Sequence, residues 1–282
     1  MIVALTGSTG MIGISLINLL LNRGHKVIAF VRNKSKKINL LPIHENLKII
    51  TLDLTELSNF SEEINADYFV HLGWDGTIGS GRNDIFSQVK NIEYTLDAVK
   101  LANKMGVKKF VGVGSQAECG LTDENISIKS KCDPVTAYGV CKYSAGKLAN
   151  IFCNELGMEF NWVRVLSVYG KNDSPLTLFS YINKCIETNE DIYLTRCEQI
   201  WDYIDCDNAA LILYKIMLYG KNNVYYPLGS GNGQPLKKYV EGFLAGKNFK
   251  GKVCYGKKSY SENQVMYLVA DMSYLKELEI KE

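Results

Sequence analysis

Short apolar runs alternate with longer amphipathic stretches through roughly the first 166 residues of the chain. The apolar runs are five or six residues long and predict strands over 2–6, 26–31, 47–52, 67–72, 109–113 and 160–165. Apolar residues at helical spacing predict helices over 11–23, 91–105 and 137–156. Strands and helices that alternate in this way predict right-handed βαβ units, in which helices cover both faces of a parallel sheet.

The pattern becomes less regular after about residue 166. Here the apolar spacing predicts helices over 176–188, 206–219 and near 236–245, and strands over 223–228 and near Cys254. Three glycines within 229–233 predict a turn. Because no repeat and no linker rich in proline or glycine separates the two halves, we expect a smaller second lobe whose segments interleave with the first.

A glycine-rich turn, T-G-S-T-G-M-I-G over residues 6–13, joins the first predicted strand to the first predicted helix. At this place Gly7 permits a tight turn, Gly10 lets the backbone approach a pyrophosphate, and Gly13 allows close packing of helix on sheet. The N–H groups that open the helix then face the phosphates. The expected dinucleotide contacts in the turn are Gly7, Thr9, Gly10, Met11, Ile12 and Gly13.

These features together predict a Rossmann-type, doubly wound α/β fold. We expect a dinucleotide-binding domain over 1–166, which also receives parts of 190–225, and a smaller interleaved substrate-binding lobe mainly over 167–282. The length of 282 residues and the apolar content of 46% are sufficient for one large or two modest domains.

Charge and cysteine usage narrow the class of protein. The formal net charge of +2 gives no argument for nucleic acid or for an acidic membrane surface. No apolar run approaches membrane-spanning length, and the pattern of a secretory leader is missing from the start of the chain. The eight cysteines are dispersed, without C-x-x-C pairs and without histidines at ligand spacing. We therefore predict reduced thiols, no metal site and a cytoplasmic location.

The end of the second predicted strand bears on the choice of cofactor. An acidic residue there would bind the ribose 2′-hydroxyl of NAD. The segment 29–34 instead reads A-F-V-R-N-K, without a carboxylate. Arg32 can pair with a 2′-phosphate through two hydrogen bonds. The sequence thus favours NADP(H) and leaves NAD(H) possible, while a solvated surface arginine is the alternative interpretation.

Tyr138 and Lys142 stand four residues apart at the start of a predicted helix, so their side chains share one face. A free tyrosine has a pKa of about 10, and a nearby ammonium would lower it into a range useful for acid–base catalysis. Tyr143 and Lys147 repeat the same spacing. We prefer the first pair because it follows a loop-to-helix entry and because its spacing from Ser115 could bring all three together.

Ser115 directly follows the fifth predicted strand. Active groups of open α/β sheets gather at the carboxyl ends of the strands, so the Ser115 hydroxyl could bind a substrate oxygen beside Tyr138. The catalytic residues predicted from the sequence are thus Ser115, Tyr138 and Lys142.

With these motifs the chain, over roughly residues 1–275, resembles the extended short-chain dehydrogenase/reductase family of nucleotide-sugar epimerases, dehydratases and reductases. The T-G-x-x-G-x-x-G motif matches 6–13, and the H-L-A-type segment resembles residues 71–73. The catalytic trio of the family corresponds to Ser115, Tyr138 and Lys142. The resemblance also implies that Asp53 contacts adenine, and it extends the cofactor contacts beyond the glycine turn, Tyr138 and Lys142 to Asp53, Leu54, Leu72, Gly73, Trp74 and Asn91.

Two further segments resemble substrate-binding motifs of this family. Residues 164–170 resemble R-x-x-N-V-Y-G, with Ser167 in place of the usual Asn. Residues 199–205 resemble the segment in which Arg often grips the nucleotide, here with Trp201, which could stack on a base or pack in the core. Trp74 could line the sugar pocket or anchor a loop. The implied substrate contacts are Trp74, Ser115, Gln116, Tyr138, Ser167 and Trp201.

One departure from the family bears on the reaction. The 4,6-dehydratases have Asp and Glu directly after the catalytic Thr, where this chain has Gln116 and Ala117. Elimination of water needs an acid and a base, and neither side chain can serve. The resemblance therefore favours a reductase over a dehydratase.

The resemblance implies an NADPH-dependent reductase that acts on a nucleotide-activated keto-sugar of the 4-keto-6-deoxy type. The segments 262–266 and 269–272 resemble CDP-abequose-synthase-like 4-ketoreductases. The alternatives are an NAD-dependent nucleotide-sugar 4-epimerase and a non-catalytic NAD(P)-sensing protein. The family also implies a homodimer in which helices 91–105 and 138–156 pair across a two-fold axis.

Overall fold

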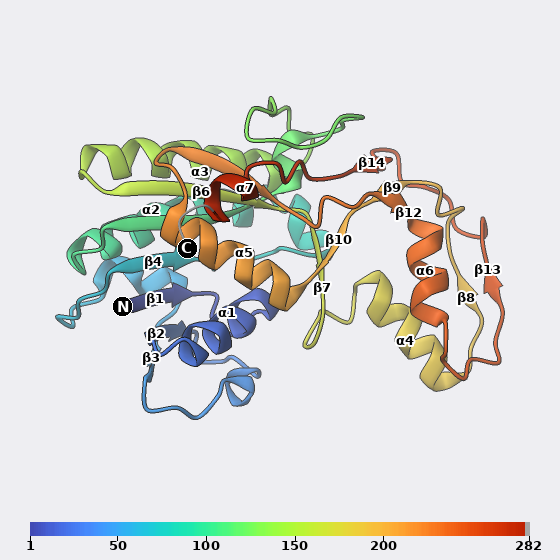
Figure 1. Cartoon of the computed structure of the whole chain (residues 1–282), viewed down its shortest axis with the longest axis horizontal. Coiled ribbons are helices and arrows are strands. Elements are labelled where there is room, and N and C mark those ends of the chain that lie inside the picture. The colour runs from blue at the N-terminus through green and yellow to red at the C-terminus, as the bar shows by residue number, and fades with distance from the viewer. Residues whose placement is uncertain (280–282) are drawn as a thin grey trace.

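The chain folds around a seven-stranded sheet, seen in a computed structural model that describes residues 1–279 (Figure 1). The strand order is β11-β6-β5-β4-β1-β2-β3, and every neighbouring pair is parallel. The strand order reverses at β1, which lies between β2 and β4, as in a Rossmann-type sheet. The predicted fold class is thus confirmed. The sheet strands are β1 (Ile2–Thr6), β2 (Lys26–Val31), β3 (Leu47–Thr51), β4 (Tyr68–His71), β5 (Lys109–Ser115), β6 (Glu159–Val165) and β11 (Val224–Leu228).

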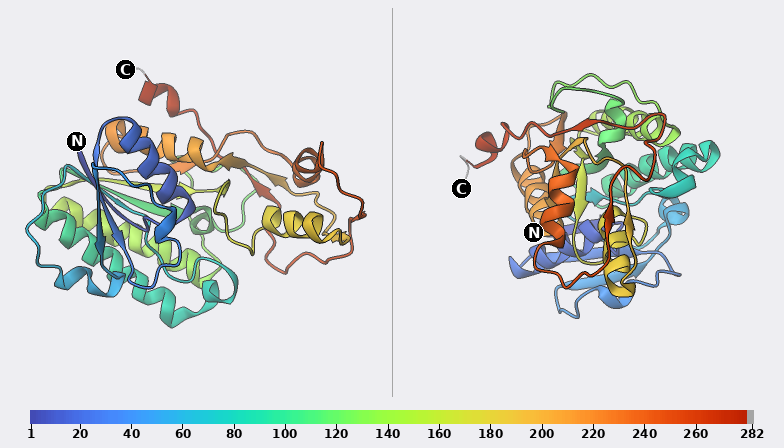
Figure 2. Two further views of the ribbon diagram at one scale, coloured as in Figure 1. Left: turned by 90° about the horizontal axis from the view of Figure 1, so that it is seen from below. Right: turned by 90° about the vertical axis from the view of Figure 1, so that its right-hand side faces the viewer.

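Two pairs of helices cover the two faces of this sheet (Figure 1, Figure 2). On one face α1 (Met11–Asn22) packs beside α5 (Cys206–Tyr219), and on the other α2 (Ile85–Lys104) packs beside α3 (Ala137–Glu155). The helix predicted from residue 91 begins six residues earlier, because the side chain of Asp84 accepts a hydrogen bond from the N–H of Ser87 and caps the helix there. The predicted strand over 109–113 runs on to Ser115.

Side chains of the central strands alternate between valines on one face and aromatic rings on the other. The rings of Phe69, Phe110, Phe160 and Trp162 form a stacked row under α2 and α3, with neighbouring centroids 5.7 to 6.4 Å apart. The fully buried Trp162 requires space that only glycine leaves. A Cβ would lie 2.2 Å from its ring at Gly112 and at Gly114, and 2.8 Å away at Gly146.

The second lobe has a core of its own, formed around α4 (Leu178–Thr188) and α6 (Leu236–Leu244). It lies beyond the carboxyl ends of the sheet strands, on the right of Figure 1. The chain passes between sheet and lobe several times, since α5 and β11 return to the sheet after α4. How the chain divides into domains stays a prediction, but these segments do interleave. The lobe and its connections contain β7 (Ser167–Tyr169), β8 (Ile192–Tyr193), β9 (Ile200–Trp201), β10 (Tyr203–Asp205), β12 (Gln234–Pro235), β13 (Val253–Cys254) and β14 (Tyr267–Leu268).

Short helices complete the description, namely η1 (Ile38–Leu40), η2 (Leu54–Asn59), η3 (Gly79–Asn83), η4 (Gln116–Cys119) and α7 (Leu275–Glu279). Within residues 1–279 none of the helices combines the length and apolar character that crossing a bilayer demands.

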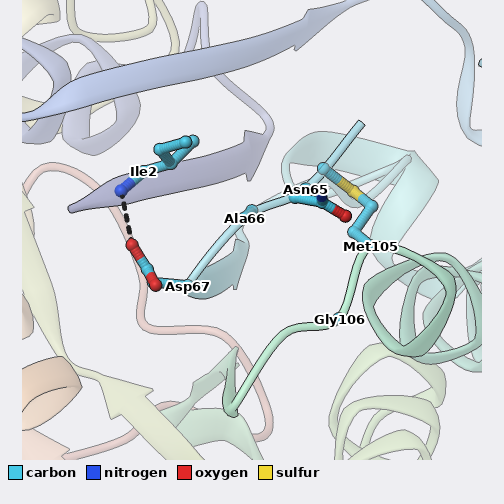
Figure 3. Close-up of a pocket in the computed structure, with 6 residues that line it drawn as sticks. All are labelled: Ile2, Asn65, Ala66, Asp67, Met105 and Gly106. Carbon is cyan, nitrogen blue, oxygen red and sulfur yellow. Dashed lines mark hydrogen bonds between the residues drawn. The ribbon is translucent and has the colours of Figure 1, made fainter. Parts of the chain in front are cut away.

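A small hollow of about 180 Å³ lies at the amino ends of β1 and β4 (Figure 3). There the carboxylate of Asp67 accepts a hydrogen bond of 2.8 Å from the backbone N–H of Ile2, which holds the two strand starts together. Ligands of open α/β sheets bind at the opposite, carboxyl edge. The hollow is therefore separate from the candidate site described below.

The fit of Trp162 against Gly146 yields a stability prediction. Alanine favours a helix over glycine by about 0.5–1 kcal/mol, but at this position its methyl group would overlap a buried ring. We expect Gly146→Ala to lower the free energy of unfolding by about 1–3 kcal/mol in urea titrations. Gly242→Ala, in α6 with open space around the added carbon, should leave stability equal or higher. An unchanged midpoint for Gly146→Ala would contradict the packing argument.

Candidate active site

The glycine turn between β1 and α1 forms a close-fitting backbone cradle at the switch point of the sheet. Gly7 has a φ of +68°, and a Cβ there would lie 2.6 Å from the backbone of Leu72 at the end of β4. At Gly13 a Cβ would lie 2.5 Å from the carbonyl oxygen of Gly7. Gly10 precedes α1, and among the described residues neither a side-chain cap nor an acid in the first turn occupies the N–H groups that open the helix. This cradle fits the phosphates of a dinucleotide.

The remaining residues of the cradle and its wall lie at the same edge. Met11 and Ile12 form the first turn of α1, and the hydroxyl of Thr9 accepts a hydrogen bond of 3.1 Å from Ser35, on the segment after β2. Across β1, Gly73 sits where a Cβ would lie 2.7 Å from the side chain of Leu54. The structure thus brings the predicted cofactor residues of β1, α1, η2 and β4 to one edge.

Two predicted cofactor contacts have partners within the protein. The side chain of Arg32 is 65% exposed, and its Nη1 lies 4.0 Å from a carboxylate oxygen of Asp75. Asp53 caps η2: its carboxylate accepts from the N–H of Thr55 at 3.3 Å, while Glu56 accepts from the N–H of Asp53 at 2.8 Å. Both residues lie beyond strand ends, as predicted, and their roles toward a nucleotide stay predictions.

His71 ties the end of β4 to β1 through a neutral imidazole. Burial lowers the pKa of this histidine to about 3. Its Nδ1 lies 2.8 Å from the hydroxyl of Thr6, and its Nε2 lies 3.3 Å from that of Thr95. Because Thr95 already donates to the carbonyl of Asn91, it accepts from Nε2–H, and Nδ1 accepts from Thr6. The Thr6 oxygen in turn accepts from the N–H of Gly73, so the strand ends are locked in register.

The loop after β4 is held by two buried amides of α2. Asn91, whose role as a cofactor contact stays a prediction, holds the loop with its side chain: it accepts from the N–H of Asp75 at 2.8 Å and donates to the carbonyl of the same residue at 3.1 Å. Gln88, which the sequence analysis did not single out, accepts from the indole N–H of Trp74 at 2.8 Å. These contacts fix Trp74, which is 9% exposed, as the anchor of the loop.

Ser115 and Tyr138 meet at the carboxyl edge of β5, as the sequence predicts. Tyr138 lies in the first turn of α3, which Thr136 caps with its hydroxyl. The side chain of Ser115 lies against the phenol and acts on its pKa. Burial raises the pKa of Tyr138 above its usual value, whereas the guanidinium of Arg82 and the hydrogen bond from Ser115 lower it. The guanidinium carbon of Arg82 stands 4.2 Å from the centre of the Tyr138 ring.

Lys142 does not lower the pKa of Tyr138 in the way that the sequence analysis expected. Its ammonium donates a hydrogen bond of 2.6 Å to the carbonyl of Val113 and lies 3.8 Å from the ring centroid of Trp74. Burial lowers the pKa of Lys142 to about 7. The i,i+4 spacing places Tyr138 and Lys142 together at the start of α3, but the cation that lies over the ring of Tyr138 is Arg82. The alternative cation, Lys147, lies against the rings of Tyr143 and Tyr225.

A buried carboxylate organises the strand ends behind the serine. Glu118 is fully buried and accepts from the N–H of Ser115 at 2.8 Å, from the indole of Trp162 at 2.9 Å and from Nε of Arg164 at 3.0 Å. The sequence analysis missed this residue, although Ser115 and Glu118 form the S-x-x-E pattern of a capping box. A charge buried here is stable only because it is paired and hydrogen-bonded.

The predicted substrate residues Ser167 and Trp201 contact each other on neighbouring segments. The indole N–H of Trp201 donates a hydrogen bond of 2.7 Å to the hydroxyl of Ser167. Trp201 is half-buried against the lobe core. Gln116, the first residue of η4, is also half-buried. Next to Trp201, the fully buried Asp202 accepts four hydrogen bonds that fix the glycine turn after β11 and the backbone of Ala270.

Comparison with known proteins places this geometry in a family. The NAD-dependent epimerase/dehydratase family model matches residues 3–229. The dTDP-6-deoxy-L-talose 4-dehydrogenase (NAD(+)) of Aggregatibacter actinomycetemcomitans is 24% identical over 90% of this chain and 93% of its own length. The CDP-abequose synthase of Salmonella muenchen is 25% identical over 98% and 91%.

A solved structure shows the same fold. UDP-glucose 4-epimerase of Thermotoga maritima, crystallised with UDP-glucose, superposes with a TM-score of 0.87 at 20% identity, over 99% of this chain and 93% of the other. With the family match covering most of the sheet and its connections, the chain belongs to the NAD-dependent epimerase/dehydratase family.

Proposed function

We propose that the chain reduces a nucleotide-activated keto-sugar of the 4-keto-6-deoxy type with NADPH. The observation that carries the proposal is that Ser115 and the phenol of Tyr138 meet at the sheet edge that also bears the glycine cradle. An acid held beside a hydride donor is the arrangement that carbonyl reduction requires. Both relatives named above act, by their names, in the chemistry of nucleotide sugars.

The cradle fits a nicotinamide dinucleotide because the backbone at Gly7 and Gly13 leaves no space for a Cβ. When bound, the dinucleotide supplies the hydride of the reduction. The open N–H groups at the start of α1 would hold its phosphates, with Thr9, Met11 and Ile12 around them. Lys142, Asn91 and the loop at Trp74 would limit the space beside the cofactor.

Tyr138 is the proton donor in this proposal. Its raised pKa keeps the phenol protonated at neutral pH, which is the form that reduction consumes. Ser115 would steady the substrate oxygen, since its hydroxyl meets the phenol and its own N–H is held by Glu118. Gln116 and Ala117 offer neither acid nor base, which speaks against water elimination. Gln116, Ser167, Trp74 and Trp201 are the proposed substrate contacts.

A 4-epimerase that retains NAD is the second candidate. The same phenol would then remove and return a proton while hydride leaves and returns to one carbon. The relative from A. actinomycetemcomitans is named with NAD(+), which keeps this cofactor open.

A cytoplasmic location remains a prediction from cysteine usage.

The reaction can be tested with a panel of 4-keto-6-deoxy nucleotide sugars plus NADPH or NADH, followed by the loss of nicotinamide absorbance. We expect NADPH oxidation with at least one sugar. Tyr138→Phe should lower the rate by about 10²–10⁴-fold, while Tyr143→Phe, the matched control on the same helix, should stay within about twofold. An epimerised product without net oxidation, from protein purified with bound NAD, would favour the epimerase.

Arg32 supports the preference for NADPH because its exposed guanidinium has only a distant carboxylate partner. We expect Arg32→Gln to raise the KM for NADPH by about tenfold, the effect of losing a charge-assisted hydrogen bond, with little change for NADH. Lys36→Gln removes the same charge from the same loop and should change neither constant. Equal KM values for both cofactors in the unsubstituted protein would overturn the preference.

We further propose a homodimer through the outer faces of α2 and α3. These two neighbouring helices carry large apolar side chains that are exposed and so do not pack on the sheet. They are Ile85, Phe86, Val89, Val140, Leu148 and Ile151. Soluble proteins rarely expose large contiguous apolar patches except where another molecule binds.

The dimer predicts a change in mass. Phe86 is 84% exposed, so Phe86→Asp should not disturb the core yet should shift the protein to monomer in light-scattering chromatography. Ile43→Asp, at a still more exposed apolar residue outside these two helices, should keep the dimer. A monomer before any substitution would exclude the proposal.

A further inference from the structure

Arg82 reaches the phenol of Tyr138 from a loop that the sequence analysis did not consider. It belongs to η3, between β4 and α2, and its guanidinium carbon lies 4.2 Å from the ring centroid. Trp74 meets the same ring edge-on, with centroids 6.1 Å apart. A guanidinium at this distance over an aromatic face is attracted by the electron-rich ring.

The loop that bears Arg82 is held in place by contacts of its own. Gly76 has a φ of +70°, and a Cβ there would lie 2.8 Å from the carbonyl of Gly81. Gln88 donates hydrogen bonds of 2.9 and 2.8 Å to the carbonyls of these two glycines. Nη1 of Arg82 donates to the carbonyl of Thr77 at 3.3 Å. These contacts fix the loop, and the loop holds the guanidinium of Arg82 over the phenol.

The charge of Arg82 is not neutralised by an ion pair with any carboxylate of the described residues. Its positive charge lowers the pKa of Tyr138, against the effects of burial and of Glu118. The other titratable groups that face this region are engaged elsewhere: Glu118 of η4 is paired with Arg164 of β6, His71 of β4 is neutral, and Lys142 of α3 is bound to the carbonyl of Val113.

We propose that Arg82 is a positioning residue that stabilises the phenolate of Tyr138 when the hydroxyl gives up its proton. The inference rests on the proposed function for the direction of transfer. As the carbonyl carbon gains hydride and the nicotinamide dinucleotide is oxidised, the O–H bond of Tyr138 breaks and its proton moves to the carbonyl oxygen. The negative charge left on the phenol spreads into the ring that Arg82 covers, so the cation favours the product of the transfer.

The pH dependence of reduction tests this role. Reduction needs protonated Tyr138, so kcat/KM falls above the pKa of the phenol. Without the cation that pKa rises, and we expect Arg82→Gln to move the alkaline limb upward by about one unit and to lower kcat at neutral pH by about tenfold. Arg82→Lys should keep the limb near its original position. Lys90→Gln, which removes an exposed charge from α2, should leave the profile unchanged.

A titration without substrate separates this inference from the proposed function. The tyrosinate absorbance of each protein, minus that of its Tyr138→Phe counterpart, reports the ionisation of Tyr138 alone. At a fixed alkaline pH the Arg82→Gln protein should contain less phenolate than the unsubstituted one. Arg82→Met, which keeps an unbranched stem without the charge, replaces Arg82→Gln if that variant unfolds.

The outcomes distinguish two failures. If the tyrosinate difference moves but no sugar is reduced, the proposed reaction is wrong and the role of Arg82 stands. The role of Arg82 is wrong if sugars are reduced but Arg82→Gln and Arg82→Met change neither the alkaline limb of kcat/KM nor the tyrosinate difference.

Discussion

The three hydrogen bonds to Glu118 hold together the edge of the sheet on which the candidate chemistry depends. The carboxylate is out of contact with solvent, and its donors come from the end of β5, from the ring of Trp162 and from Arg164. A charge in such a place is tolerated only with all its partners, so β5, β6 and η4 can meet in one arrangement. That arrangement fixes the backbone of Ser115, and with it the hydroxyl that lies against the phenol of Tyr138.

Burial at this edge has opposite effects on the two residues of the Tyr/Lys pair. It raises the pKa of Tyr138 and lowers that of Lys142 to about 7, because each group is driven toward its neutral form. The amino group of Lys142 donates to the carbonyl of Val113 and lies over the ring of Trp74. The positive charge that lowers the pKa of the phenol comes instead from Arg82, on the loop that Gln88 holds.

The sequence predicted the sheet, its helices and the meeting of Ser115 with Tyr138, because strand–helix rhythm and strand ends determine these relations. It could not predict where the Lys142 ammonium would bind, since helical spacing defines a shared face but not the neighbours of that face. Arg82 was missed because a loop without periodicity carries no positional signal, and Gln88 was missed because the helix was predicted to begin only at residue 91. Glu118 differs from these residues, because the S-x-x-E pattern that it forms with Ser115 is a sequence signal for a capping box. Asn91 lay at the predicted edge, yet its amide is engaged by the backbone of Asp75.

The chain returns to the sheet with α5 and β11 after the lobe has begun. Cutting the chain at one position therefore cannot separate the sheet domain from the lobe. A fragment that stopped at residue 166 would leave β6 as a bare edge and the apolar face of α1 uncovered. Exchange of the lobe between members of this family would accordingly need at least three junctions, namely one before α4, one before α5 and one after β11. The lobe is thus built from insertions between elements of the sheet domain, not from a module appended to its end.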